Sequence, residues 1–149
     1  MSSVIYGTLE GDETIISVAV GIKKAVHTNG FVARLGGDEF IIVLPKIEEK
    51  RAIEIANKVV ESVRQLNIEH KYRLPPVTAA SELSNQELRN EKKAIVTVSV
   101  GVTTGYVESN ANVDWYNKFI TALIQKTDDN LYKAKHNGRD GYFYEIYKG

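Results

Sequence analysis

Cysteine is absent from this chain of 149 residues, which excludes disulfide bonds, thiol nucleophiles and cysteine-based metal sites together. Net charge is absent as well, because 19 Lys and Arg residues balance 19 Asp and Glu residues. No overall basic field is therefore available to attract a nucleic-acid polymer, although a local cationic patch for a single nucleotide stays compatible with this balance. No apolar run approaches the ~18 residues of a membrane span, and no signal-peptide pattern opens the chain. We expect a cytoplasmic protein that makes no membrane contact.

The residues that are present have the composition of an ordinary globular protein, with 43% hydrophobic and 26% charged residues. This length suits one domain, so we expect a single domain over residues 1–149. Apolar residues at helical spacing predict helices over residues 12–28, 48–66 and 114–136. Alternating or continuous apolar runs predict strands over residues 31–35, 40–44, 95–102 and 142–147. Residues 67–93 lose both patterns, and we interpret them as an inserted loop.

The segment with the most functional information is residues 34–40, Arg-Leu-Gly-Gly-Asp-Glu-Phe, which joins two predicted strands. Gly36 and Gly37 tolerate the positive φ of a tight turn and let a bulky anionic ligand approach the backbone. Asp38 and Glu39 repel each other, so the pair suits a site where a divalent cation offsets the charge. Gly-Gly-Asp is also ordinary turn chemistry, and this simpler interpretation stays open on these residues alone.

Three further segments occur in an order that resembles one known family. Residues 6–13 read Tyr-Gly-Thr-Leu-Glu-Gly-Asp-Glu, residues 97–102 read Thr-Val-Ser-Val-Gly-Val, and residues 128–139 contain Leu-Tyr-Lys-Ala-Lys-His-Asn-Gly-Arg. Together with residues 34–40 they resemble the GGDEF family, the diguanylate cyclase domains of bacterial signalling proteins. The resemblance implies an α+β sandwich with the ferredoxin-like palm of nucleotidyl transferases, in which helices flank a mainly antiparallel central sheet.

One element of the family pattern is missing. The family has a long apolar strand before residue 6 that lies in the middle of the sheet and carries the first metal-binding aspartate, whereas only five residues, none of them Asp, precede Tyr6. Removing a central strand exposes edges on both neighbouring strands, which favours pairing with another chain. Three interpretations follow: the chain is a truncated form of a longer parent, another copy or another polypeptide fills the gap, or the sheet closes without the strand.

The resemblance implies that two GTP molecules condense into cyclic di-GMP with Mg²⁺ or Mn²⁺ as the cofactor. Asp38 would be a metal ligand, and Glu39 would bind metal or activate the attacking hydroxyl group. The backbone of Gly36 and Gly37 would lie against the phosphates. Magnesium commonly takes one or two carboxylates together with phosphate oxygens, which agrees with this assignment. The missing first aspartate leaves catalysis by this chain an open question.

The resemblance also assigns the rest of the GTP site. Asp12 would read guanine, although a carboxylate in that place could instead cap the helix that it opens. Lys135 and Arg139 would hold the β- and γ-phosphates. For Lys135, a favourable position near a helix C-terminus is an alternative, and this alternative explains Arg139 less well.

The family works as a transient homodimer with one GTP in each half, so we expect a homodimer, either of this kind or through an open sheet edge. The family's product-inhibition motif, R-x-x-D, is replaced by His27 and Gly30 at its two ends, so we expect no feedback binding of cyclic di-GMP there. A second hypothesis is a catalytically incomplete GGDEF-like module that binds GTP or a protein partner in a regulatory role. Ser3 and Thr8, where the family has Asn and His, favour this second hypothesis.

Overall fold

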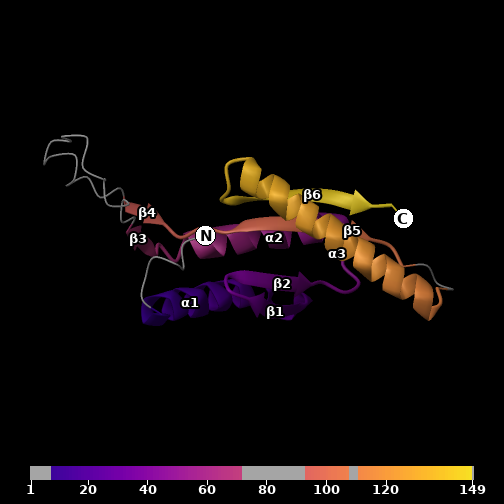
Figure 1. The fold of residues 1–149 in the computed structure, drawn as a ribbon, viewed down its shortest axis with the longest axis horizontal. Helices are drawn as coiled ribbons and strands as arrows, with labels where there is room; N and C mark the ends of the chain where they lie inside the picture. Colours follow the sequence, from indigo (N-terminus) through magenta and orange to yellow (C-terminus); the bar gives the residue numbers. More distant parts are fainter. Residues whose placement is uncertain (1–7, 72–92, 108–110, 149) are drawn as a thin grey trace, which may run out of the picture.

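The structure, a computed structural model, describes residues 8–71, 93–107 and 111–148 (Figure 1). The elements follow in the order α1 (Thr8–Val26), η1 (His27–Asn29), β1 (Phe31–Gly36), β2 (Glu39–Val43), α2 (Glu49–Arg64), β3 (Glu69–Lys71), β4 (Lys93–Ile95), β5 (Ser99–Gly105), α3 (Val113–His136) and β6 (Gly141–Tyr147). The three predicted helices and the predicted β-hairpin are confirmed, and α1 begins four residues earlier than expected.

The main core lies where α1 packs against α2. Buried aliphatic side chains from both helices form one cluster, made of Val18, Ile22 and Val26 from α1 and Ile55, Val59 and Val63 from α2. Each of these side chains contributes roughly 1.5–3 kcal/mol by leaving water. Side chains of the β1–β2 hairpin, of β5 and of the segment before β5 also pack against this cluster.

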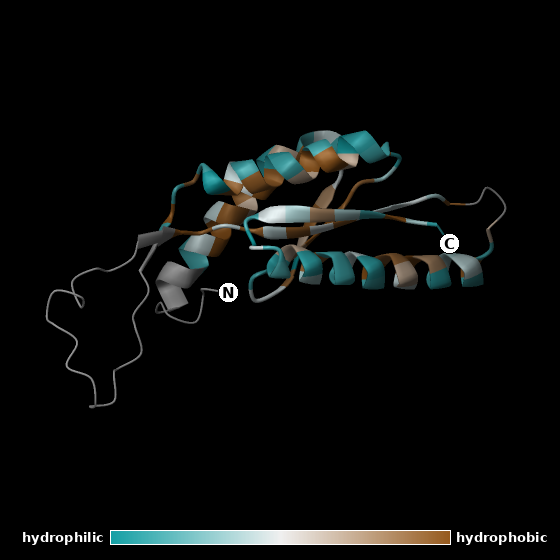
Figure 2. Ribbon diagram, turned by 90° about the horizontal axis from the view of Figure 1, so that it is seen from above, coloured by the Kyte–Doolittle hydropathy of each residue, from teal (hydrophilic) through white to brown (hydrophobic). Residues whose placement is uncertain are grey.

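The fold is α+β, as predicted, but the strands of the described residues form three separate two-stranded sheets. β1 pairs with β2 and β3 pairs with β4, both antiparallel, whereas β5 pairs with β6 in parallel. The predicted continuous sheet is therefore interrupted between the β1–β2 hairpin and the β5–β6 pair. β5 and β6 lie between α2 and α3, and the hydrophobic residues gather where helices meet strands (Figure 2).

The prediction of one strand over residues 95–102 is wrong. β4 ends at Ile95, and β5 runs from Ser99 to Gly105. The alternating valines continue through this region, but the pairing partner changes: the Val96 N–H still bonds the Ile68 carbonyl next to β3, and the ladder with β6 begins at Ser99. Alternation reports which side chains share a face, so it cannot show where a strand changes its partner.

The predicted loop over residues 67–93 needs a correction at its two ends. Glu69–Lys71 forms β3 and pairs antiparallel with β4, which begins at Lys93. Residues 72–92 lie outside the described part of the chain. A three-residue strand is too short to show an alternating pattern, and for this reason β3 could not be predicted from the sequence.

One face of the β1–β2 hairpin is apolar and exposed. Phe31 and Leu35 of β1 keep 71% and 67% of their surface accessible, and Val43 of β2 keeps 52%. The opposite face, with Val32, packs on the core. Both faces of the hairpin are therefore apolar. No helix in the described residues has the length and hydrophobicity needed to cross a bilayer.

Candidate functional site

The turn at residues 36–39 has a defined backbone geometry. Gly36 pairs with Glu39, so Gly37 and Asp38 form a two-residue loop, and the register shifts between Arg34 and Gly36. Gly37 has a φ of 53°, whereas Asp38 is not among the residues with positive φ. A positive φ at only the first loop residue is the combination of a type II′ turn, which requires glycine at this position.

The space above this turn is open. A Cβ atom added at Gly36 or at Gly37 would meet no atom within 4 Å. The side chains of Asp38 and Glu39 are exposed and form no hydrogen bond or ion pair with the described residues. A bare backbone next to two unpaired carboxylates leaves room for a phosphate and its cation.

The donor set of the turn fits a cation shared with phosphate. The described residues contain no group of three or more Asp, Glu or His side chains that could hold a metal ion by themselves. Magnesium keeps several water ligands and is often bound by one or two carboxylates plus substrate phosphates. Asp38 and Glu39 together can supply that number of protein ligands, so the turn suits a metal–nucleotide complex better than a permanently bound ion.

Asp12 lies in the second turn of α1 and its side chain is exposed. Because α1 begins at Thr8, Asp12 is the fifth helical residue and does not cap the helix. The capping alternative is therefore wrong. Its assignment to guanine stays a prediction.

The two predicted phosphate-binding cations lie at the end of α3. Lys135 belongs to the last turn of the helix, and Arg139 follows the helix; both side chains are exposed. Gly138, Arg139 and Asp140 have φ values of 101°, 61° and 47°, so three consecutive residues lie in the left-handed region. Such a conformation is unfavourable for non-glycine residues, and it persists only where contacts hold it.

The contact that holds this connection comes from α2. Arg64 Nε donates a hydrogen bond of 3.1 Å to Asp140 Oδ2, and Arg64 Nη2 donates to the Asp140 carbonyl at 3.4 Å. The hydrogen bond to the Asp140 carboxylate raises the pKa of Arg64 above its ordinary value. An α2 side chain thus holds both the side chain and the backbone carbonyl of Asp140, the residue that follows Arg139. The sequence reasoning missed this pair, which joins residues 76 positions apart.

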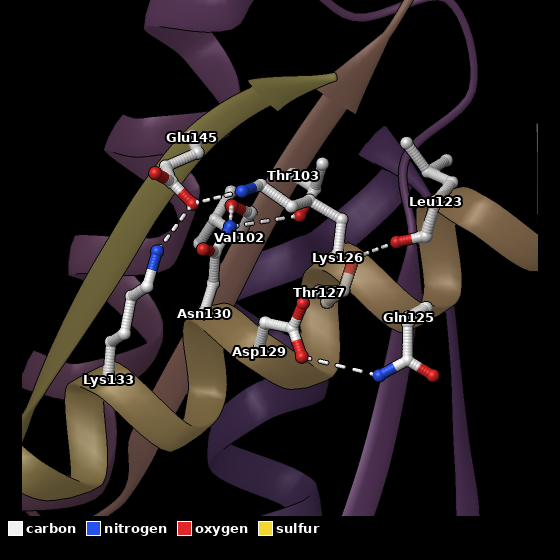
Figure 3. Close-up of polar contacts among 10 residues, drawn as sticks. All are labelled: Val102, Thr103, Leu123, Gln125, Lys126, Thr127, Asp129, Asn130, Lys133 and Glu145. Carbon is white, nitrogen blue, oxygen red and sulfur yellow. Dashed lines mark hydrogen bonds and ion pairs between the residues drawn. The ribbon is translucent and has the colours of Figure 1, made fainter. Parts of the chain in front are cut away.

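The position of α3 itself is set by its contacts with β5 and β6 (Figure 3). Glu145 of β6 accepts from Lys126 Nζ at 2.7 Å and from Lys133 Nζ at 2.8 Å, and these bonds lower the pKa of Glu145. Asn130, fully buried, donates to the Val102 carbonyl at 2.9 Å. At Gly101 the helix comes so close that an added Cβ would lie 2.2 Å from the Thr127 carbonyl oxygen.

The predicted site residues come from two sides of the molecule. In Figure 1, α1 and the β1–β2 hairpin lie below α2 and β5, and the connection from α3 to β6 lies above them. Within the described residues, no hydrogen bond or ion pair joins the side chains of Asp12, Asp38, Lys135 and Arg139 to one another. The structure therefore leaves these four charged side chains without partners among the described residues, and their common binding of one nucleotide stays a prediction.

A hollow lies away from the turn, where the end of α1 meets α2. Its volume is about 650 Å³, and its lining includes the cations Lys24, Arg51 and Lys58 together with His27. The turn at residues 36–39 does not contribute to this hollow. We place the candidate site at the turn and not at this hollow, because the carboxylates and the open glycine backbone are at the turn.

Comparisons with known proteins agree with the motifs. The family described as "Diguanylate cyclase, GGDEF domain" matches residues 4–82. Probable diguanylate cyclase DgcF of Escherichia coli O157:H7 is 30% identical over 135 residues, which cover 91% of this chain and 24% of that protein. Diguanylate cyclase A of Treponema denticola is 28% identical over 135 residues, covering 91% of this chain and 29% of that protein. The chain thus spans about a quarter of the length of these relatives.

Solved structures show the same fold. The active GGEEF domain of a diguanylate cyclase from Vibrio cholerae matches with a TM-score of 0.59 and 25% identity, covering 97% of this chain and 72% of that one. Diguanylate cyclase SiaD of Pseudomonas aeruginosa, solved in complex with its activator SiaC, matches with a TM-score of 0.62 and 22% identity, covering 98% of this chain and 45% of that one. The palm-type fold predicted from the motifs is confirmed.

Proposed function

Because this chain belongs to the GGDEF family of diguanylate cyclase domains, we propose that it condenses two molecules of GTP into cyclic di-GMP and releases pyrophosphate. The observation that carries the proposal is the turn at residues 36–39, where two exposed, unpaired carboxylates lie beside an open glycine backbone. The proposed substrate is a cytoplasmic nucleotide, which agrees with the expected location of the chain.

The residues at the turn would bind the reacting end of GTP. Asp38 and Glu39 would hold Mg²⁺ or Mn²⁺ against the phosphates, and the Gly36–Gly37 backbone would lie beside them. The bound cation would stabilise the charge that develops on the attacking and leaving oxygens. As an alternative to binding the metal, Glu39 would accept the proton of the attacking 3′-hydroxyl group.

The remaining residues would position the nucleotide. Lys135 and Arg139 would bind the β- and γ-phosphates, and the strained connection held by Arg64 would keep Arg139 in place. Asp12 would accept hydrogen bonds from guanine N1 and N2, which selects GTP over ATP because adenine has no matching donors. Each chain would bind one GTP, so the product would form in a transient homodimer whose two halves face each other.

The direct test is to incubate the purified chain with GTP and Mg²⁺ at high protein concentration and to detect cyclic di-GMP by chromatography. The matched control is a variant with Asp38→Asn and Glu39→Gln, which keeps the size of both side chains and removes their charge. Product from the natural chain but not from the variant supports the proposal. Equal amounts from both, or no product from either, would contradict it for this chain.

A second function is favoured by the sequence, because Ser3 and Thr8 stand where the family has Asn and His. In this alternative the chain binds GTP without turning it over, and serves as a regulatory GGDEF-like module. Calorimetry separates the two functions: GTP binding with Mg²⁺ but without pyrophosphate release indicates the regulatory module, and binding with release indicates the enzyme.

A further inference from the structure

Arg34 makes an unusual use of its side chain. Its Nε and Nη2 atoms both donate to one acceptor, the carbonyl oxygen of Gly37, at 2.9 Å and 2.7 Å. A guanidinium group commonly grips a carboxylate with two parallel bonds. In the described part of the chain, Arg34 is exposed and has no carboxylate partner. Its guanidinium group therefore binds only the backbone of the turn.

The carbonyl that Arg34 holds belongs to the one peptide unit in the turn that can reverse. In a two-residue loop, type I′ and type II′ turns differ in the orientation of the middle peptide, here the peptide between Gly37 and Asp38. Type I′ needs a positive φ at both residues, which glycine adopts freely and aspartate tolerates. Gly37 and Asp38 therefore permit both turns, and the loop residues alone do not select one.

We infer that Arg34 is a positioning residue: by holding the Gly37 carbonyl it keeps the turn in one of its two orientations. Because the peptide bond is planar and trans, fixing this carbonyl also fixes the Asp38 N–H in the opposite direction. The backbone from which the Asp38 and Glu39 side chains project is fixed with it. The effect of this contact on GTP binding rests on the proposed function, whereas its effect on the conformation of the turn does not.

Loss of the hydrogen bonds from Arg34 to the Gly37 carbonyl should reduce ligand affinity, because the turn would then also adopt its other conformation. When a binding-competent state is only partly populated, the apparent dissociation constant rises by the inverse of its fraction. A charge-assisted hydrogen bond of this kind is worth about a tenfold change in an equilibrium constant. Because the loop residues alone favour neither turn, losing this bond should lower the binding-competent fraction from about nine tenths to about one half. We expect Arg34→Met to weaken binding of Mn²⁺–GTP about twofold. Arg34→Lys keeps the charge but has no fork, so it should restore affinity only in part.

The experiment has two readouts on the same proteins. Amide signals of Gly37, Asp38 and Glu39 are followed by nuclear magnetic resonance, and Mn²⁺–GTP binding is followed by calorimetry. The matched control is Arg51→Gln, because Arg51 is a half-buried arginine away from the turn that pairs with Glu54 on α2. We expect one narrow set of turn signals in the natural chain and in Arg51→Gln. In Arg34→Met we expect shifted or broadened signals at those three residues.

Unchanged turn signals in Arg34→Met would overturn the inference. If Arg34→Met fails to fold, as judged by circular dichroism, the signals of Arg34→Lys decide instead, and turn signals identical to those of the natural chain would again overturn it. Absence of Mn²⁺–GTP binding by the natural chain would contradict the proposed function. The amide signals would still decide the role of Arg34, so the two failures are distinguishable.

Discussion

At the scale of single residues, position 37 requires glycine because of its positive φ and not because neighbouring atoms crowd it. Its φ is 53°, and an added Cβ would meet nothing within 4 Å. Gly37→Ala should therefore destabilise the fold by about 1–2 kcal/mol through the left-handed conformation alone. Gly37→Asn is the matched control, since asparagine tolerates this region better and should cost less. Urea unfolding measures both, and an equal loss in the two variants would contradict the explanation.

Asp12 offers a second test at the residue scale, because its predicted role can be separated from folding. The side chain is exposed and lies inside α1, away from the N-cap. Asp12→Ala should leave the urea midpoint unchanged and should reduce the preference for GTP over ATP, measured by calorimetry with both nucleotides. A large shift in the urea midpoint would indicate a structural role instead. An unchanged nucleotide preference would remove Asp12 from the guanine site.

At the scale of elements, the packing of α3 on β5 depends on Gly101. An added Cβ would lie 2.2 Å from the Thr127 carbonyl oxygen and 2.4 Å from the Leu131 nitrogen, both backbone atoms that cannot move separately from the helix. We expect Gly101→Ala to displace α3 and to destabilise the fold by about 3 kcal/mol, at the upper end of overpacking costs.

The control for this prediction lies on the partner strand. Gly141 pairs with Ser99 of β5, and the nearest atom to its added Cβ is 3.6 Å away, which is an ordinary contact. Gly141→Ala should therefore leave the unfolding free energy nearly unchanged. Because α3 also carries Lys135, only Gly101→Ala should weaken nucleotide binding. Equal stability of the two variants would show that α3 does not depend on this close approach.

The ion pairs between α3 and β6 predict a dependence on pH. Hydrogen bonds from Lys126 and Lys133 lower the pKa of Glu145 below its ordinary value of 4.5. A lowered folded-state pKa adds stability above the unfolded pKa, and this stability is lost as the pH falls through the folded pKa. The stability difference between the natural chain and Glu145→Gln should thus be full at pH 7 and shrink below about pH 4.5. A difference that stays constant down to pH 3 would contradict this.

The elements also show what the sequence could predict and what it could not. The helices were predictable because the spacing of Ile15, Ala19, Ile22 and Val26 is a local pattern; Ile22 and Val26 are buried, and Ile15 and Ala19 are half-buried. The end of β4 could not be predicted from the sequence, because the change of pairing partner near Val96 depends on β3, which is distant in the sequence. The turn was found from its glycines and carboxylates. The contacts that support the site, Arg34 on Gly37 and Arg64 on Asp140, depend on side-chain geometry that no spacing rule reports.

At the scale of the whole molecule, the proposed reaction joins two nucleotides, whereas the chain presents one turn with Asp38 and Glu39. A single chain should bind one GTP and should be unable to close the cyclic product alone. In the range where monomers dominate, mass action then requires that doubling the protein concentration raise the total rate roughly fourfold. The measurement is the initial rate of pyrophosphate release at saturating GTP over a dilution series, with sedimentation run in parallel. A rate that only doubles, in samples that sediment as monomers, would show that each chain works alone and would contradict the two-half arrangement.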